Sequence, residues 1–373
     1  MRLLIVYPYW TYPEVAIEFL MKIAERGHEI IAIKAGDNIK KVIAHKIDNV
    51  IIYDVQNLNL SFNVNIVEKY PYFINFEEVL RGIEFDILII QLPLFLSSIQ
   101  ALKIGKKLRK PMVTEVHGLY ANRNLIVTLM QKIYLRSIGL KMFREVDLIR
   151  CVNKTDACEI ARYGISSDKI RVIPNAVNTD LFVPSENKDE KTLFWSGRMV
   201  PEKGLKYLLK ALYILQKSGY KDVRLIMAGD GPERFKIINL IRKYQLTNNV
   251  RMLGHVPRKI LAKYLSLATI FVFPSLREGM PIALFEALAS GLPSVCTDVP
   301  GIKDYITHGY NALLVPPKNP EIMADAIAML LEDRILRRKL SENARKYVIT
   351  NFSYQKIIPV LEKFYEEVSR GIR

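Results

Sequence analysis

The chain has 373 residues, of which half are apolar and a quarter are charged. This composition is typical of globular proteins and argues against a disordered chain, and the length suits two domains of about 150 residues each. The formal net charge of +16 suits nucleic acid or an anionic membrane surface as a partner, and charge alone does not separate the two.

The first half alternates short β-branched runs with segments of helical periodicity, which predicts repeated strand–helix units. It begins with a strand at Leu3–Tyr7, a helix at Val15–Arg26 and a strand at Glu29–Lys34. Later strands are predicted, with helices between several of them, at Val50–Tyr53, Asp86–Gln91, Met112–Val116, Leu148–Val152 and Ile170–Ile173. Such alternation predicts a parallel sheet that binds ligands beyond the carboxyl ends of its strands.

The chain opens directly on a strand and shows no secretory signal pattern, so we expect a cytoplasmic protein. The longest apolar stretch, Ile87–Leu102, is interrupted by polar residues and falls short of the roughly 20 apolar residues that a membrane span needs. Three cysteines, an odd number without the close spacing of zinc ligands, argue against a disulfide framework and a zinc site. We expect all three to be buried: Cys151, Cys158 and Cys296.

Basic residues gather between Lys103 and Arg144, where ten of them accompany a single acidic residue, Glu115. No zinc-finger spacing or aromatic RNA-binding signature is present, so we expect no nucleic acid partner, and the mixture with apolar residues suits an anionic membrane interface. An ordinary solvated surface is the alternative. The ten are Lys103, Lys106, Lys107, Arg109, Lys110, Arg123, Lys132, Arg136, Lys141 and Arg144.

Prolines, asparagines and charged residues predict a linker at about 174–191, between a first domain at 1–183 and a second at 184–353. Strand–helix alternation then restarts, which predicts a second doubly wound domain. A final helix, at 354–373, is expected to return to the first domain. The second-domain elements are predicted at Leu193–Ser196, Leu205–Lys217, Arg224–Ala228, Glu233–Tyr244, Val250–Leu253, Lys259–Ser266, Ile270–Pro274, Ile282–Ser290, Pro293–Thr297, Ile322–Glu332 and Arg334–Asn351.

Two glutamates, Glu278 and Glu286, flank Pro281, which suits the first turn of a helix. Backbone amides at the start of that helix favour negative charge. A carboxylate before the helix can accept hydrogen bonds from sugar hydroxyls, and one within it can bind the hydroxyls of a ribose. Apolar neighbours make a merely solvated Glu286 the weaker interpretation.

A second cluster follows the strand that ends at Ser196. Gly197 lets a ligand approach the backbone, and Arg198 and Lys203 precede the next helix. A guanidinium fork and a compact ammonium suit a diphosphate, although basic residues near a helix start are often only surface residues.

The motifs SGRMVPEKG, IMAGDGPE, LGHVP and REGMPIALFEALASGLPSV, in this order, resemble the donor domain of glycosyltransferase family 4, the group 1 type. Thr297–Pro317 extends the resemblance, and RGHEI, TEVHG and KIRVIPNAV are similar to the first domain of that family. The resemblance implies an α/β protein of GT-B fold, with two doubly wound Rossmann-like domains facing a central cleft. The chain departs from the family at Trp10–Pro13, in place of a Gly-Gly loop, and at Ala176, in place of a glycine.

The resemblance also implies site roles. Arg198 and Lys203 would bind the donor diphosphate, and Glu286 would bind the ribose. Gly197 would let the donor approach the backbone. Glu278 and the Gly279, Met280 and Pro281 backbone would contact the transferred sugar, His255 and Val256 would lie near the base, and His117 would face the sugar from the acceptor domain.

The implied activity is retaining transfer of a sugar from a nucleotide-diphosphate sugar to a glycan or lipid-linked acceptor, in cell-surface polysaccharide or glycolipid synthesis. Arg198 and Lys203 would take the place of a divalent ion, and no Asp-x-Asp motif occurs, so we expect no essential metal and no cofactor besides the donor. Two alternatives are a nucleotide-sugar epimerase of the same architecture and a basic membrane-binding or nucleic-acid-binding protein with a decayed donor site. A glycoside hydrolase pair is a poorer interpretation of the two glutamates.

Overall fold

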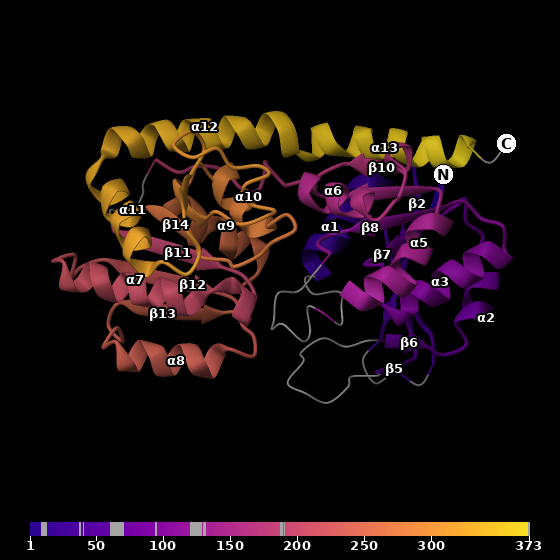
Figure 1. The fold of residues 1–373 in the computed structure, drawn as a ribbon, viewed down its shortest axis with the longest axis horizontal. Coiled ribbons are helices and arrows are strands. Elements are labelled where there is room, and N and C mark those ends of the chain that lie inside the picture. Colours follow the sequence, from indigo (N-terminus) through magenta and orange to yellow (C-terminus); the bar gives the residue numbers. More distant parts are fainter. Residues whose placement is uncertain are drawn as a thin grey trace. The chain divides into compact units, whose positions relative to one another are not determined.

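The computed structural model describes residues 1–8, 13–36, 39, 41–59, 71–93, 95–119, 129, 132–186, 189 and 191–371. These residues form two compact units (Figure 1). The first holds the described residues up to Pro174 and those from Ile357 onward, and the second holds Asn175–Lys356. The chain therefore passes between the units at the start of the segment for which we predicted a linker.

The first unit is built on a sheet of strand order β10-β9-β8-β7-β1-β2-β4-β3, in which only the β3–β4 pair is antiparallel among the described strands. A separate antiparallel ribbon pairs β5 with β6. The strands are β1 Arg2–Val6, β2 Glu29–Ala35, β3 Ile43–Ile47, β4 Val50–Val55, β5 Asn57–Asn59, β6 Pro71–Phe73, β7 Ile87–Gln91, β8 Met112–Val116, β9 Leu148–Cys151 and β10 Ile170–Val172. The helices are α1 Pro13–Ala24, α2 Phe76–Arg81, α3 Leu96–Lys107, η1 Leu135–Gly139, α5 Leu140–Glu145, α6 Lys154–Arg162, η2 Ser167–Lys169 and, for its greater part, α13 Tyr354–Arg370.

The second unit is built on a parallel sheet of strand order β13-β12-β11-β14-β15-β16. Helix α7 packs beside α8 and α11, and α10 packs beside α12 (Figure 1). The strands are β11 Thr192–Ser196, β12 Arg224–Ala228, β13 Val250–Gly254, β14 Ile270–Phe273, β15 Ser294–Thr297 and β16 Leu313–Val315. The helices are η3 Pro201–Lys203, α7 Leu205–Lys217, α8 Arg234–Lys243, α9 Arg258–Leu267, α10 Ile282–Ala289, α11 Pro320–Glu332 and α12 Arg334–Phe352.

The central strands of each sheet are buried on both faces. Every residue of β7, β11 and β14 is buried, which explains their continuous apolar sequences and is the pattern of parallel strands covered by helices. Because the strands run parallel, their carboxyl ends lie along one edge of each sheet. The loops that follow them carry the candidate residues.

Three features differ from the sequence predictions or were not anticipated. β3 pairs antiparallel with β4 at the sheet edge and is largely exposed, so its sequence lacks the apolar run on which the strand predictions rested. β16 is only three residues long. Cys151 and Cys296 are buried as expected, but Cys158 is exposed, because it lies on the outer face of α6.

No helix in the described part of the chain is both long enough and apolar enough to cross a bilayer. Two sets of residues named in the sequence predictions lie outside the described residues. They are Trp10–Tyr12, where the chain departs from the family pattern, and Arg123 of the basic cluster.

Candidate functional site

Two of the predicted site residues, Lys203 and Glu278, are in direct contact. Lys203 ends η3 after β11, and Glu278 lies in the loop between β14 and α10. The lysine Nζ lies 2.6 Å from the glutamate Oε1, and 5.0 Å from the centroid of the Phe273 ring. Both side chains are largely shielded from water, which strengthens a charged hydrogen bond. Residues 75 positions apart in sequence thus meet at the carboxyl ends of adjacent strands.

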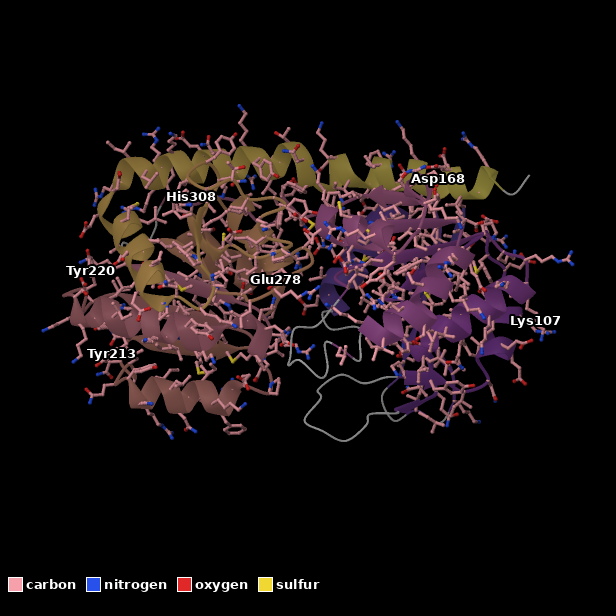
Figure 2. All side chains as sticks on the ribbon, in the orientation of Figure 1. Lys107, Asp168, Tyr213, Tyr220, Glu278 and His308 are labelled. Atoms are coloured by element: carbon pink, nitrogen blue, oxygen red, sulfur yellow. The ribbon has the colours of Figure 1, made fainter. Side chains whose placement is uncertain are left out.

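Glu278 lies at the ligand-binding edge of the second sheet, as a comparison with Tyr220 shows. Tyr220 lies shortly before the amino end of β12, whereas Glu278 follows the carboxyl end of β14. The two residues lie at opposite ends of the second unit (Figure 2). Glu278 therefore marks the edge of the sheet at which doubly wound folds bind ligands.

The loop of Glu278 is held by a glycine that sequence analysis did not single out. Gly301 has a φ of +82°, and a Cβ at this position would collide with the carbonyl oxygens of Glu278 and Gly279. Glycine is needed both for the left-handed backbone and for this close approach. The signal was present, since Gly301 lies inside the stretch Thr297–Pro317 that resembles the family.

Glu286 is buried within α10, with 3% of its surface exposed. Its Oε1 accepts a hydrogen bond of 2.6 Å from Nη1 of Arg258, the first residue of α9. The Arg258 guanidinium also lies 5.1 Å from the centroid of the Phe182 ring. A buried carboxylate requires such a partner, so Arg258 orients Glu286. Arg258 was not predicted from the sequence, because no local pattern shows that α9 and α10 are neighbours.

Gly197 and Arg198 directly follow β11, and both are partly exposed. Gly197 N–H donates to Ala228, which ties this loop to the end of β12. Within the described part of the chain, the Arg198 side chain makes no hydrogen bond or ion pair. The nearby hydroxyls of Ser196 and Ser275 are buried and have no hydrogen-bond partner among the described residues, although buried polar groups are usually bonded. Cationic and hydroxyl donors thus lie at the same sheet edge.

The remaining donor-side predictions lie in the same unit. Met280 and Pro281 are buried just before α10, and the Asn175 N–H lies 3.0 Å from the Met280 sulfur. His255 is exposed and Val256 is partly exposed in the loop between β13 and α9. The structure shows where these residues lie, and their contacts with a donor stay predictions.

His117 follows β8 in the first unit, and 29% of its side chain is exposed. It belongs to a buried network that sequence analysis did not foresee. The His117 Nε2 lies 2.8 Å from Gln91 Oε1, and Gln91 Nε2 donates to Glu115 Oε2 at 2.6 Å. Arg150 donates to the same oxygen at 2.8 Å, and the Tyr365 hydroxyl on α13 donates to Glu115 Oε1 at 2.8 Å. This network joins the ends of β7, β8 and β9 to the C-terminal helix.

Two opposing effects act on the pKa of Glu115. Burial by itself raises the pKa, but the Arg150 guanidinium, the nearby His117 ring and the hydrogen bond from Gln91 lower it to about 2. Burial and the Glu115 charge raise the pKa of Tyr365 well above its usual value. Glu115 is therefore ionised at neutral pH, whereas the Tyr365 hydroxyl stays protonated and donates a hydrogen bond to the carboxylate.

Two family models match the sequence in succession. Residues 177–347 match the family described as Glycosyl transferases group 1, and residues 14–181 match Glycosyltransferase Family 4. An uncharacterized glycosyltransferase of Methanocaldococcus jannaschii is 32% identical over 55% of both chains. Alpha-D-kanosaminyltransferase of Streptomyces kanamyceticus is 31% identical over 48% of this chain and 46% of that protein. The chain thus spans about half the length of these relatives.

Solved structures share the fold at low sequence identity. Sucrose-phosphate synthase from Thermosynechococcus elongatus has a TM-score of 0.80 with 19% identity over 99% of both chains. Anabaena HepE, in complex with UDP and glucose, has a TM-score of 0.76 with 17% identity over 98% of this chain and 100% of that one. These similarities establish the predicted GT-B fold. Since the two family matches together run from residue 14 to residue 347, the chain belongs to glycosyltransferase family 4, the group 1 glycosyl transferases.

Proposed function

We propose that the chain is a retaining glycosyltransferase that moves a sugar from a nucleotide-diphosphate sugar to a glycan or lipid-linked acceptor. The observation that carries this proposal is the Lys203–Glu278 pair at the carboxyl edge of the second sheet, beside Arg198. It unites a cation for the diphosphate with a carboxylate for the sugar hydroxyls. Family membership and a solved neighbour that binds UDP and glucose support the same substrate class.

The proposed chemistry is electrostatic. As the bond between the sugar and the diphosphate breaks, Arg198 and Lys203 stabilise the charge that develops on the leaving group. Glu278 accepts hydrogen bonds from hydroxyls of the sugar, and the acceptor oxygen attacks from the face that the diphosphate leaves. The configuration at the anomeric carbon is thereby retained, and the two cations replace a divalent ion.

The acceptor is proposed to be reached at an anionic membrane surface. The described basic residues Lys132, Arg136 and Lys141 are exposed, and Ile133 and Ile138 beside them are exposed apolar residues. Basic side chains next to exposed apolar ones are typical of interfacial segments. Part of the predicted charge is neutralised, because Lys106 pairs with Glu145 and Lys107 with Glu77.

A screen of UDP-, GDP-, ADP- and TDP-sugars tests the proposed reaction. We expect release of the nucleoside diphosphate from one donor class, a product with the donor's anomeric configuration, and unchanged rates in EDTA. The Glu278→Gln variant, checked for folding by circular dichroism, is the inactive control. A folded wild-type protein that releases no nucleotide from any donor, with or without candidate acceptors, contradicts the proposal. Release of a free epimer without acceptor supports the epimerase alternative instead, and activity restored only by magnesium or manganese contradicts metal independence.

A further inference from the structure

The charge of Glu115 determines which group donates and which accepts in each hydrogen bond of the buried network. An ionised carboxylate only accepts hydrogen bonds. The groups around it are all donors: the Arg150 guanidinium, the Gln91 amide and the Tyr365 hydroxyl. Glu115 is 1% exposed and Gln91 is 5% exposed, so water does not offer a competing arrangement.

The orientation of the Gln91 amide in turn determines which group faces His117. Because the Gln91 NH2 group must face the carboxylate, its carbonyl oxygen Oε1 faces the ring at 2.8 Å from His117 Nε2. The nearer oxygen of Glu115 lies 3.6 Å from the same nitrogen. Both neighbours of Nε2 are acceptors, so Nε2 must carry a proton.

Arg150 keeps the network in place. Its Nε and Nη2 donate at 3.0 and 2.9 Å to the carbonyl oxygens of Ile173 and Pro174, where the first unit ends. With Nη1 on Glu115, the guanidinium is fixed on three sides. Neither Glu115 nor Gln91 can then rotate without breaking a buried, charged hydrogen bond, which is costly.

We propose that Gln91 is a positioning residue that keeps a proton on Nε2 of His117, so that the ring in its neutral form offers Nδ1 as its hydrogen-bond acceptor. No hydrogen bond to Nδ1 occurs among the described residues. An acceptor nitrogen suits a hydroxyl group of the acceptor, as a hydrogen-bond partner or as the source of the proton lost on transfer. This use of Nδ1 rests on the proposed sugar transfer, whereas the tautomer itself does not.

The tautomer can be read directly by NMR. Proton–nitrogen correlation spectra of protein with isotope-labelled histidine distinguish the two ring nitrogens, and the chain has only five histidines. The His117→Asn variant assigns the signal by its disappearance. For the neutral form of the ring we expect a single tautomer with a slowly exchanging Nε2 proton. A His117 ring protonated at Nδ1, or an averaged mixture, overturns the proposal.

Two variants test whether Gln91 is the cause. Gln91→Leu removes the nearer acceptor and leaves only the Glu115 oxygen, 3.6 Å from Nε2. Glu115→Gln lets the Gln91 amide reverse, so both variants should raise the share of the Nδ1-protonated form. Tautomer populations unchanged in both folded variants contradict the positioning role. In the transfer assay, Gln91→Leu should lower kcat about tenfold with little change in the donor KM, as for lost transition-state stabilisation. If transfer fails with every donor while the tautomer holds, only the proposed function is wrong.

Discussion

At the scale of single residues, the cations at the edge of the second sheet carry the proposed reaction. We expect Arg198→Ala and Lys203→Ala each to lower turnover by about tenfold to a thousandfold, because each removes charge that stabilises the departing diphosphate. Lys206→Ala is the matched control, since this exposed lysine lies only three positions further along the chain. Steady-state kinetics with circular dichroism measure the effect. Normal turnover in both site variants contradicts the assignment.

Glu115 makes a prediction for stability against pH. Its pKa falls from 4.5 to about 2 on folding, so its stabilising contribution is complete above pH 4.5 and is lost as the pH falls towards 2. Glu115→Gln should therefore lower the urea midpoint of the first unit at neutral pH, and the gap from wild type should narrow below pH 4.5.

The control for this prediction is a carboxylate at the surface. Glu77 also has a lowered pKa, through hydrogen bonds from Lys107 and Arg81, but 40% of its side chain is exposed to solvent. Glu77→Gln should change the urea midpoint little, because exposed ion pairs contribute little to stability. If the difference in urea midpoint between wild type and Glu115→Gln stays constant with pH, the pKa of Glu115 does not change on folding.

At the scale of elements, the loop between β14 and α10 depends on the loop that follows β15. Gly301→Ala forces a side chain against the Glu278 and Gly279 carbonyls, whereas Gly309, with a φ of +73°, has open space at its Cβ. Both alanines should incur the cost of a left-handed backbone, about 1–2 kcal/mol. Only Gly301→Ala should also weaken donor binding, because it displaces Glu278. Thermal unfolding and nucleotide titration compare the two, and equal donor affinity contradicts the coupling between these loops.

At the scale of the whole molecule, charge should govern membrane attachment. Each basic residue near an anionic surface contributes about 1 kcal/mol, so a few suffice for reversible binding. We expect the protein to co-sediment with anionic but not neutral vesicles, and less so as salt rises, because salt screens the attraction. A variant with Lys132, Arg136 and Lys141 changed to glutamate should lose this binding. Equal binding to both lipids, or none to either, contradicts membrane docking and leaves sugar transfer unaffected.

Prediction from sequence succeeded where the information is local. The buried strands β7, β11 and β14 were recognisable because parallel strands covered on both faces have continuous apolar sequences. The exposed edge strand β3 and the three-residue β16 were not, since neither has such a run. In the site, Lys203 and Glu278 were identified from strand-to-helix junctions and from the family resemblance, and their contact was not foreseen.

The sequence by itself determined the two doubly wound domains, the family, and the residue types at the carboxyl ends of the strands, because each depends on periodicity and short motifs. Only the tertiary structure decided which of those residues meet. Arg258 reaches Glu286 across 28 positions, and Tyr365 reaches Glu115 across 250. No local pattern encodes such pairs, since strand order and helix packing decide which distant residues become neighbours. The direction of the hydrogen bonds at His117 follows from that burial, because a carboxylate cut off from water takes its donors from the protein.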